Sequence, residues 1–176
     1  MKYIIYDIET SGLSPLKDRI VSIGIKTKED ERILMNDDEK KLIEEFWDYL
    51  KNHKKKYGSF VLVGYNSVAF DLYFIKIRSA YHKVPVMPIE KYKEHIDLYW
   101  VLTPYGSRKG KLDDFCNLFG FPAQYESMGD AVPKAWKDKN YELIIKHNED
   151  DIRRTYQLFR VCLENNLIES EIDLRV

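Results

Sequence analysis

The sequence has no long apolar run. Its first hydrophobic stretch, residues 3–6, is interrupted by Asp7, which is too early for the core of a signal peptide. No later stretch approaches the roughly 20 consecutive apolar residues that cross a bilayer. We therefore expect a cytoplasmic protein with no membrane partner.

Cysteine is scarce, and repeats and low-complexity tracts are absent. The two cysteines, Cys116 and Cys162, fall in segments with amphipathic helical spacing and form no C-x-x-C pair. Buried free thiols are thus expected, rather than a disulfide or a zinc site. With 44% hydrophobic residues among 176, the chain can bury one substantial core. We expect a single domain over residues 1–176, with a tail of undetermined packing at residues 166–176.

Charge of one sign is not in excess. The 28 Lys and Arg residues against 29 Asp and Glu residues give a net charge of -1. This balance does not indicate a nucleic-acid partner. It does not exclude one either, because acids gathered to bind metal offset basic patches elsewhere in the same sum.

Hydrophobic periodicity predicts an α/β protein. Short apolar or alternating segments indicate strands at residues 3–8, 20–25, 32–35, 60–65 and 94–99. The first three would form an antiparallel meander, and the continuous run at residues 60–65 is typical of a strand near the centre of a sheet. Helical spacing indicates helices at about residues 42–50, 70–77, 111–119, 128–137 and 140–165.

Two helices carry more specific expectations. Asn66 or Ser67 is a candidate cap for the helix that follows the strand at residues 60–65. The last long helix should bury one apolar stripe, made of Ile145, Ile152, Tyr156, Phe159 and Leu163.

Asp7 and Glu9 stand at the end of the first expected strand. Successive side chains of a strand point to opposite faces, so both carboxylates would share one face while Ile8 packs into the core on the other. Close like charges raise each other's pKa unless a positive charge lies between them, and a divalent metal ion is the usual solution. A strand end with two solvated acids is the alternative interpretation.

Further acids stand at the boundaries of later elements. Asp71 falls in the first turn of a helix, directly after the strand expected to be central. On the last helix, His147 and Asp151 are four residues apart and therefore share a face. An isolated pair of this kind is usually a surface pair, but its neighbours include Glu149 and Asp150, and such crowding favours a bound cation.

Taken in order, these acids resemble the motifs of the DEDD superfamily of 3′ to 5′ exonucleases, which have an RNase-H-like fold. D-I-E-T-S-G at residues 7–12 looks like the first exonuclease motif, and residues 66–71 look like the second, N-x-x-x-F-D. The third motif is Y-x-x-x-D in one branch and H-x-x-x-x-D in the other. Here His147 and Asp151 combine the spacing of the tyrosine branch with the residue of the histidine branch.

The resemblance runs from residue 3 to about residue 160. Residues 95–99, 111–113 and 129–134 look like the exonuclease domains of archaeal-type family-B DNA polymerases and their stand-alone relatives. No polymerase portion is present in the sequence. The resemblance implies a mixed sheet, an antiparallel meander plus parallel strands, flanked by helices.

The resemblance also implies two divalent metal ions, Mg or Mn, held by four carboxylates. Asp7 would bridge both metals, and Glu9 and Asp151 would lie at the metal that holds the nucleophilic water. Asp71 would support the other metal, mainly through water. Asp150 is an alternative to Asp151, which we favour because Ile152 and Thr155 then match the family's register.

His147 would orient or deprotonate the attacking water, as Tyr or His does in the two branches. An imidazole accepts a proton near neutral pH more readily than a phenol, whose pKa is about 10. Histidine is shorter than tyrosine, however, so whether its ring reaches the water at this spacing is an open question. The alternative interpretation is that His147 is an exposed helix residue with no functional role.

The implied substrate is the 3′ end of a single-stranded nucleic acid, with DNA favoured over RNA. Leu13, Tyr65 and Asn66 lie beside the motifs, where a terminal nucleotide would bind. Residues 54–56 and 108–111 are basic and are candidates for phosphate contacts, although a solvated surface explains them equally well.

Two other functions share most of these features. A degenerate exonuclease-like module would keep the fold and only bind nucleic acid or protein; the His147 departure supports it and the four acids oppose it. An RNase-H-like endonuclease would use the same acids but leaves N-x-x-x-F-D unexplained. The oligomeric state is left open.

Overall fold

The computed structural model describes the chain except for residues 1, 91–92, 105–107, 125–130 and 169–176. The described strands form one sheet in the order β3-β2-β1-β4-β5. They are β1 (Lys2–Thr10), β2 (Ile20–Lys26), β3 (Glu31–Met35), β4 (Phe60–Gly64) and β5 (His95–Asp97). The first three pair antiparallel, whereas β4 pairs parallel with β1 and β5. The predicted mixed sheet and its antiparallel meander are therefore confirmed.

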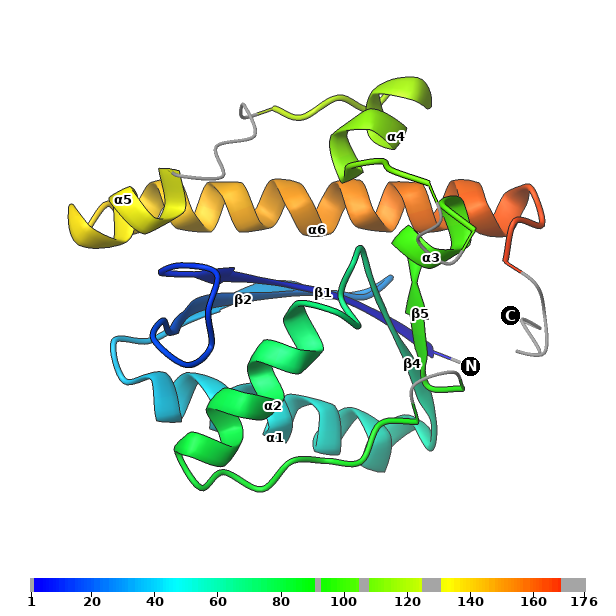
Figure 1. Ribbon diagram of the computed structural model, residues 1–176. Helices are drawn as coiled ribbons and strands as arrows, with labels where there is room; N and C mark the ends of the chain where they lie inside the picture. Colours follow the sequence, from blue (N-terminus) through cyan, green and yellow to red (C-terminus); the bar gives the residue numbers. More distant parts are fainter. Residues whose placement is uncertain (1, 91–92, 105–107, 125–130, 169–176) are drawn as a thin grey trace.

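Helices cover both faces of this sheet (Figure 1). On one face lie α1 (Glu39–Tyr57) and α2 (Asp71–Tyr81), and the long α6 (Tyr141–Glu164) crosses the other face. The short helices are α3 (Leu98–Leu102), α4 (Leu112–Leu118) and α5 (Ala131–Lys137). Asp38 caps α1 and Asn140 caps α6, each through its side chain. This three-layer arrangement is the RNase-H-like architecture that the motifs implied.

The central strand is β1, and its residues alternate between two cores. Tyr6 and Ile8 pack in the core under α1 and α2, while Ile5 packs in the core under α6. The period of two in a strand then directs Asp7 and Glu9 toward α6, as the sequence predicted. The strand at residues 60–65 was expected near the centre, and β4 does lie inside the sheet, between β1 and β5.

The face of α6 that meets the sheet mixes apolar and polar side chains. Its fully buried residues follow helical spacing and include Ile144, Asn148, Ile152, Thr155, Leu158, Phe159 and Cys162. Ile144, rather than the expected Ile145, occupies the innermost position, and Tyr156 and Leu163 are only partly buried. The buried stripe therefore begins at Ile144, one residue earlier than predicted. It also includes the polar Asn148, which a search for apolar spacing does not select.

The connection from β4 to α2 differs from the expectation. Neither Asn66 nor Ser67 caps α2, which begins at Asp71 after Phe70 without any side-chain cap. Asn66 has a left-handed φ of 56°. Ser67 instead lies with its Oγ 2.9 Å from His95 Nε2. The chain therefore turns sharply after β4 before the helix starts, which explains why the capping prediction was wrong.

The ends of the remaining elements agree with the sequence in part. β5 stops at Asp97, earlier than expected, because the Asp97 side chain caps α3 through the Tyr99 N–H. α5 begins at Ala131, and residues 128–130 of the predicted helix lie outside the described residues. The same is true of the tail at residues 169–176.

Cys116 and Cys162 are buried free thiols, as predicted. Among the described residues, none of the helices combines the length and the apolar character needed to cross a membrane.

Gly24 tests how closely α6 must approach the sheet. A Cβ at this position of β2 would lie 2.6 Å from Ile152 Cγ2 and 3.0 Å from the Asn148 side-chain amide. Gly24→Ala is expected to lower the free energy of unfolding by about 1–3 kcal/mol, because overpacking forces α6 outward. A urea titration followed by circular dichroism measures the change, and a variant as stable as the wild type would show that α6 has room to move.

Candidate active site

Neighbouring residues of α6 contact alternate residues of β1. His147 Nδ1 lies 2.6 Å from Glu9 Oε1. The next residue, Asn148, donates from Nδ2 to Asp7 Oδ2 at 2.9 Å. The carboxylates of Asp7 and Glu9 are therefore both fixed from the same helix.

Glu9, His147 and Asp151 form a compact group. Each offers one ligand atom, and these atoms all lie within 4.8 Å of one another. The His147 Nδ1 atom is 3.4 Å from Asp151 Oδ2, one helical turn away. Oxygen donors with one imidazole suit a divalent ion such as Mn²⁺ or Mg²⁺, so the residues fit the implied metal.

Asp71 approaches the same end of β1 from the other layer. It is the first residue of α2 and is 3% exposed. Its Oδ1 accepts the backbone N–H of Ile8 at 3.0 Å. Burial raises the pKa of Asp7 most, and repulsion from Asp71, Asp151 and Glu9 raises it further, so the four carboxylates interact electrostatically.

Burial disfavours the ionised form of each of these four acids. It raises the pKa of Asp71 to about 7, and it raises the pKa of Asp7 well above the usual range. Burial also raises the pKa values of Glu9 and Asp151. A bound cation would relieve this repulsion, which is a second reason why the residues fit a metal.

His147 supplies one positive charge inside the group. Its hydrogen bond to Glu9 raises the pKa of the imidazole to about 9, although burial opposes this. Only 17% of its side chain is exposed, so His147 is not the exposed helix residue of the alternative interpretation. An imidazolium at this position therefore offsets part of the negative charge of Glu9 and Asp151.

Asp150 and Asp151 have different surroundings. Asp150 is buried against Arg154 and accepts the backbone N–H of Gln124 at 3.2 Å. Asp151 also contacts Arg154, but it faces His147 and Glu9. The structure thus brings Asp151, and not Asp150, into the group with Glu9.

Sequence reasoning missed Asn148 and Arg154. Asn148 is fully buried between Asp7 and Ser22, and Arg154 is 5% exposed and pairs with Asp113 on α4 as well as with Asp151. A signal existed for Asn148, because it stands four residues from both Ile144 and Ile152 on the buried stripe. A polar residue on such a stripe needs a buried partner.

Asp97 is another residue whose role was missed. Its carboxylate accepts the backbone N–H groups of Asn66 at 2.8 Å and Val68 at 2.9 Å, as well as that of Tyr99. These hydrogen bonds fix the turn at residues 66–68, which precedes Asp71 and so helps to position it. The Asn66 side chain itself is exposed beside this turn.

The expected substrate-binding residues differ in exposure. Leu13 is 83% exposed on the loop that follows β1. Tyr65 is half-buried, with its hydroxyl donating to Gly110 O at 2.8 Å and its ring packed edge-on against Tyr99. Tyr65 therefore presents part of its ring, while its polar end serves the local structure.

The two basic segments lie at opposite ends of the sheet. Lys54 pairs with Glu94, and Lys56 lies over the ring of Tyr57, which also contacts Lys2 where β1 begins. Residues 108–111 instead lie beside Tyr65, at the end of the sheet that carries the acids. Of these two basic segments, the second is therefore the one at the same end of the sheet as the acids.

Comparisons with known proteins agree with this geometry. Residues 16–174 match a family model described as a predicted 3′-5′ exonuclease related to the exonuclease domain of PolB. An uncharacterized protein of Methanocaldococcus jannaschii is 34% identical, over 96% of this chain and 99% of its own length. A DNA polymerase of Archaeoglobus fulgidus is 32% identical over 93% of this chain.

A solved structure supports the fold independently. The family B DNA polymerase from the hyperthermophilic archaeon Pyrobaculum calidifontis superposes on 95% of this chain with a TM-score of 0.77 and 22% sequence identity. The chain spans 25% of the length of that polymerase and 23% of the length of the Archaeoglobus enzyme. The shared part thus corresponds to a single region of each polymerase.

Asp71→Asn tests the cost of the buried acids. The folded-state pKa of about 7 lies above the ordinary value of 3.8, so the folded protein holds this proton more tightly than the unfolded chain. The destabilisation is absent below about pH 4, grows as the pH rises, and is complete above about pH 7. Asn is uncharged and still accepts from Ile8.

In EDTA, the variant should be more stable than the wild type by a few kcal/mol at about pH 8, and equally stable at about pH 4. Urea titrations at both pH values measure this difference. Asp48→Asn, at an exposed carboxylate, is the control and should change neither. Equal stabilities at the higher pH would mean that Asp71 is not destabilised by its surroundings.

Proposed function

This chain belongs to the family of predicted 3′-5′ exonucleases related to the exonuclease domain of PolB, and on that premise we propose that it is a metal-dependent 3′ to 5′ exonuclease. Its substrate is the 3′ end of a single-stranded nucleic acid, with DNA favoured over RNA, and residues 1–176 act as one domain. The observation that carries the proposal is the group of Glu9, His147 and Asp151, within 4.8 Å, at the strand end that also holds Asp7.

Four carboxylates hold the divalent ions in this proposal. Two divalent ions, Mg²⁺ or Mn²⁺, would share Asp7; Glu9 and Asp151 would hold the one on the side of the attacking water, and Asp71 would support the other. When bound, such ions activate a water molecule and stabilise the leaving 3′ oxygen. Asn148 fixes the carboxylate of Asp7 through its 2.9 Å hydrogen bond.

His147 orients and deprotonates the attacking water. Its Nδ1 is held by Glu9, so the other ring nitrogen, Nε2, is the one that accepts the proton. The pKa of about 9 keeps the ring protonated beside Glu9 and Asp151, but a divalent ion held by these two carboxylates would lower that pKa, so that the neutral ring could accept the proton.

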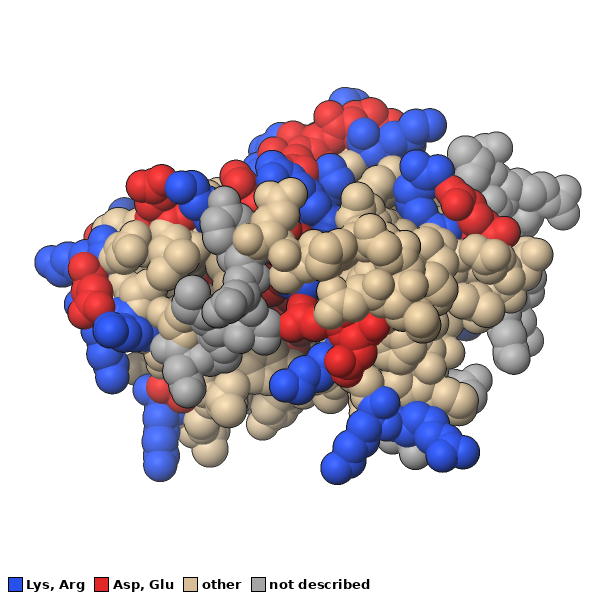
Figure 2. All heavy atoms as spheres, turned by 90° about the horizontal axis from the view of Figure 1, so that it is seen from above, with Lys and Arg blue, Asp and Glu red and all other residues tan. Residues whose placement is uncertain are grey.

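The nucleic-acid strand enters between Leu13 and the turn at Asn66. Tyr65 and Leu13 contact the terminal bases, Asn66 contacts the backbone, and residues 108–111 attract phosphates. On the face seen in Figure 2, Lys and Arg side chains project from the margin with Asp and Glu side chains among them, and the basic ones would attract the phosphates of a nucleic-acid strand. Such contacts are sequence-independent.

A 5′-labelled single strand incubated with Mn²⁺ tests the function. A time-resolved ladder of products shortened from the 3′ end is expected. Internal cuts would point to an endonuclease of the RNase-H type. Binding without cleavage would point to a degenerate binding module, and either result would contradict the proposal.

His147→Ala tests the role of the imidazole. Loss of a general base should lower kcat by about 10²- to 10⁴-fold and leave strand affinity nearly unchanged. Single-turnover digestion and fluorescence anisotropy measure the two quantities. His53→Gln, at an imidazole near the start of β4, is the control and should keep full activity. A His147 variant with wild-type kcat would assign the proton transfer to another group.

A further inference from the structure

The loop between β1 and β2, which directly follows the strand that carries Asp7 and Glu9, exposes two leucines. Leu13 and Leu16 are 83% and 80% exposed, more than the other large hydrophobic side chains of the described residues. They follow Glu9 by only a few residues. Contiguous patches of exposed apolar side chains mark contact sites for ligands or partners.

This loop is nevertheless tightly built. Ser11 N–H donates to Arg19 O at 2.9 Å, and Arg19 N–H donates back to Ser11 Oγ at 3.0 Å. Ser14 N–H donates to Asp18 Oδ2 at 2.9 Å. A Cβ on Gly12 would lie 2.5 Å from the Asp18 carboxyl group, so the backbone is closed against that side chain. The two leucines are therefore held on a rigid frame.

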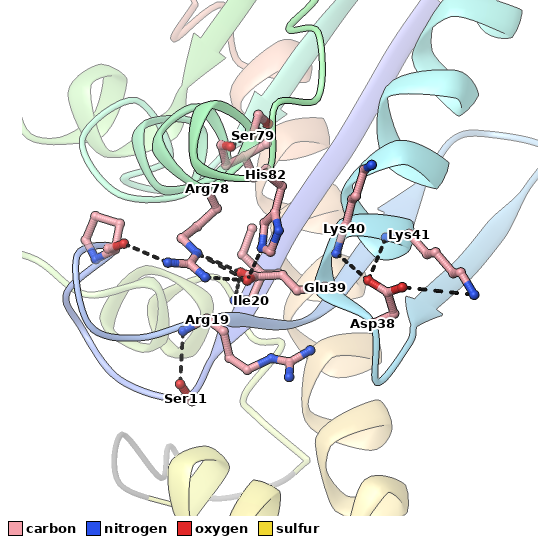
Figure 3. A network of polar contacts seen from close by, with 12 residues as sticks. Ser11, Arg19, Ile20, Asp38, Glu39, Lys40, Lys41, Arg78, Ser79 and His82 are labelled. Atoms are coloured by element: carbon pink, nitrogen blue, oxygen red, sulfur yellow. Dashed lines mark hydrogen bonds and ion pairs between the residues drawn. The ribbon is translucent and has the colours of Figure 1, made fainter.

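A buried carboxylate at the start of α1 anchors the frame (Figure 3). Glu39 is 5% exposed and accepts the backbone N–H of Ile20, the first residue after the loop, at 2.8 Å. It also receives Arg78 Nη2 at 2.6 Å and lies 2.7 Å from His82 Nε2. Although burial opposes it, the bonds from Arg78 and His82 lower the pKa of Glu39, so the group stays ionised.

Arg78 connects this carboxylate to the loop. Its Nε and Nη2 atoms bind Glu39, while Nη1 donates to Pro15 O at 3.3 Å. Pro15 stands between Leu13 and Leu16. One guanidinium thus joins the tip of the loop to α1 and α2, whereas Glu39 fixes the point where the loop returns to the sheet.

We infer that Glu39 and Arg78 are positioning residues that hold Leu13 and Leu16 as one apolar contact for the terminal bases of the bound strand. This inference rests on the proposed exonuclease function and adds Leu16 and the two anchoring residues to it. Apolar contact with base faces tolerates any sequence, which an exonuclease requires. Preorganisation spares the strand the entropy of ordering the loop.

Arg78→Lys tests the anchor. Lysine keeps the charge but cannot both bind Glu39 through two nitrogens and reach Pro15 O. The KM for digestion, and the Kd for a 5′-fluorescein oligothymidine in EDTA, should each rise about tenfold, with kcat changed less than about twofold. Arg32→Lys is the matched control, because Arg32 also pairs with a carboxylate and lies over a tyrosine ring, but on β3. It should change neither constant.

A double-mutant cycle separates positioning from general stability. In a Leu13→Ala/Leu16→Ala background, Arg78→Lys should have no further effect on Kd, because the contact that it positions is gone. The same effect in both backgrounds, or a fall in kcat at constant KM, would overturn the inference.

Leu16→Ala keeps the test decisive if Arg78→Lys does not fold. Its side chain is exposed, so the fold should tolerate the change, and Kd should again rise several-fold. An unchanged Kd would overturn the inference while leaving wild-type digestion, and so the proposed function, intact. A wild type that neither binds nor digests the strand would overturn both.

Discussion

Repulsion between buried carboxylates is the constraint on which the rest of the structure depends. Asp7 and Glu9 on β1 share one end of the sheet with Asp71 from one layer and Asp151 from the other, and burial raises the pKa of each. Side chains and a backbone amide of the surrounding elements offset this repulsion with hydrogen bonds and positive charge. Asn148 donates to Asp7, Ile8 N–H donates to Asp71, and His147 and Arg154 bring positive charge to Asp151. Under the proposed function, a divalent ion bound here would relieve this repulsion and so stabilise the folded protein.

The elements and the acids could be predicted from the sequence because their signals are local. Alternation in β1 placed Asp7 and Glu9 on one face, and the four-residue spacing on α6 placed His147 beside Asp151. The cap of α2 was wrong because Asp97, distant in sequence, takes the N–H groups of the turn at Asn66. The partners of Asn148 and Arg154 are likewise set by how α6 and α4 pack, which no single segment encodes.

Rigidity around the site has two separate sources. On the α6 side, side chains that touch the acids directly limit their movement. On the α1 and α2 side, Glu39 and Arg78 act on the loop of Leu13 without touching the acids. The first source would set the rate of the chemical step, and the second would set the affinity for the strand. Defects in kcat and in KM should therefore map to different layers of the fold.

A crystal structure of the protein soaked with Mn²⁺, with anomalous scattering recorded at the manganese edge, tests the central claim most directly. The proposed function predicts anomalous peaks at the end of β1, with Asp7 between two ions and with Glu9 and Asp151 as ligands of one of them. Density for Mn²⁺ elsewhere only, or Glu9 and Asp151 without manganese at saturating Mn²⁺, would contradict it.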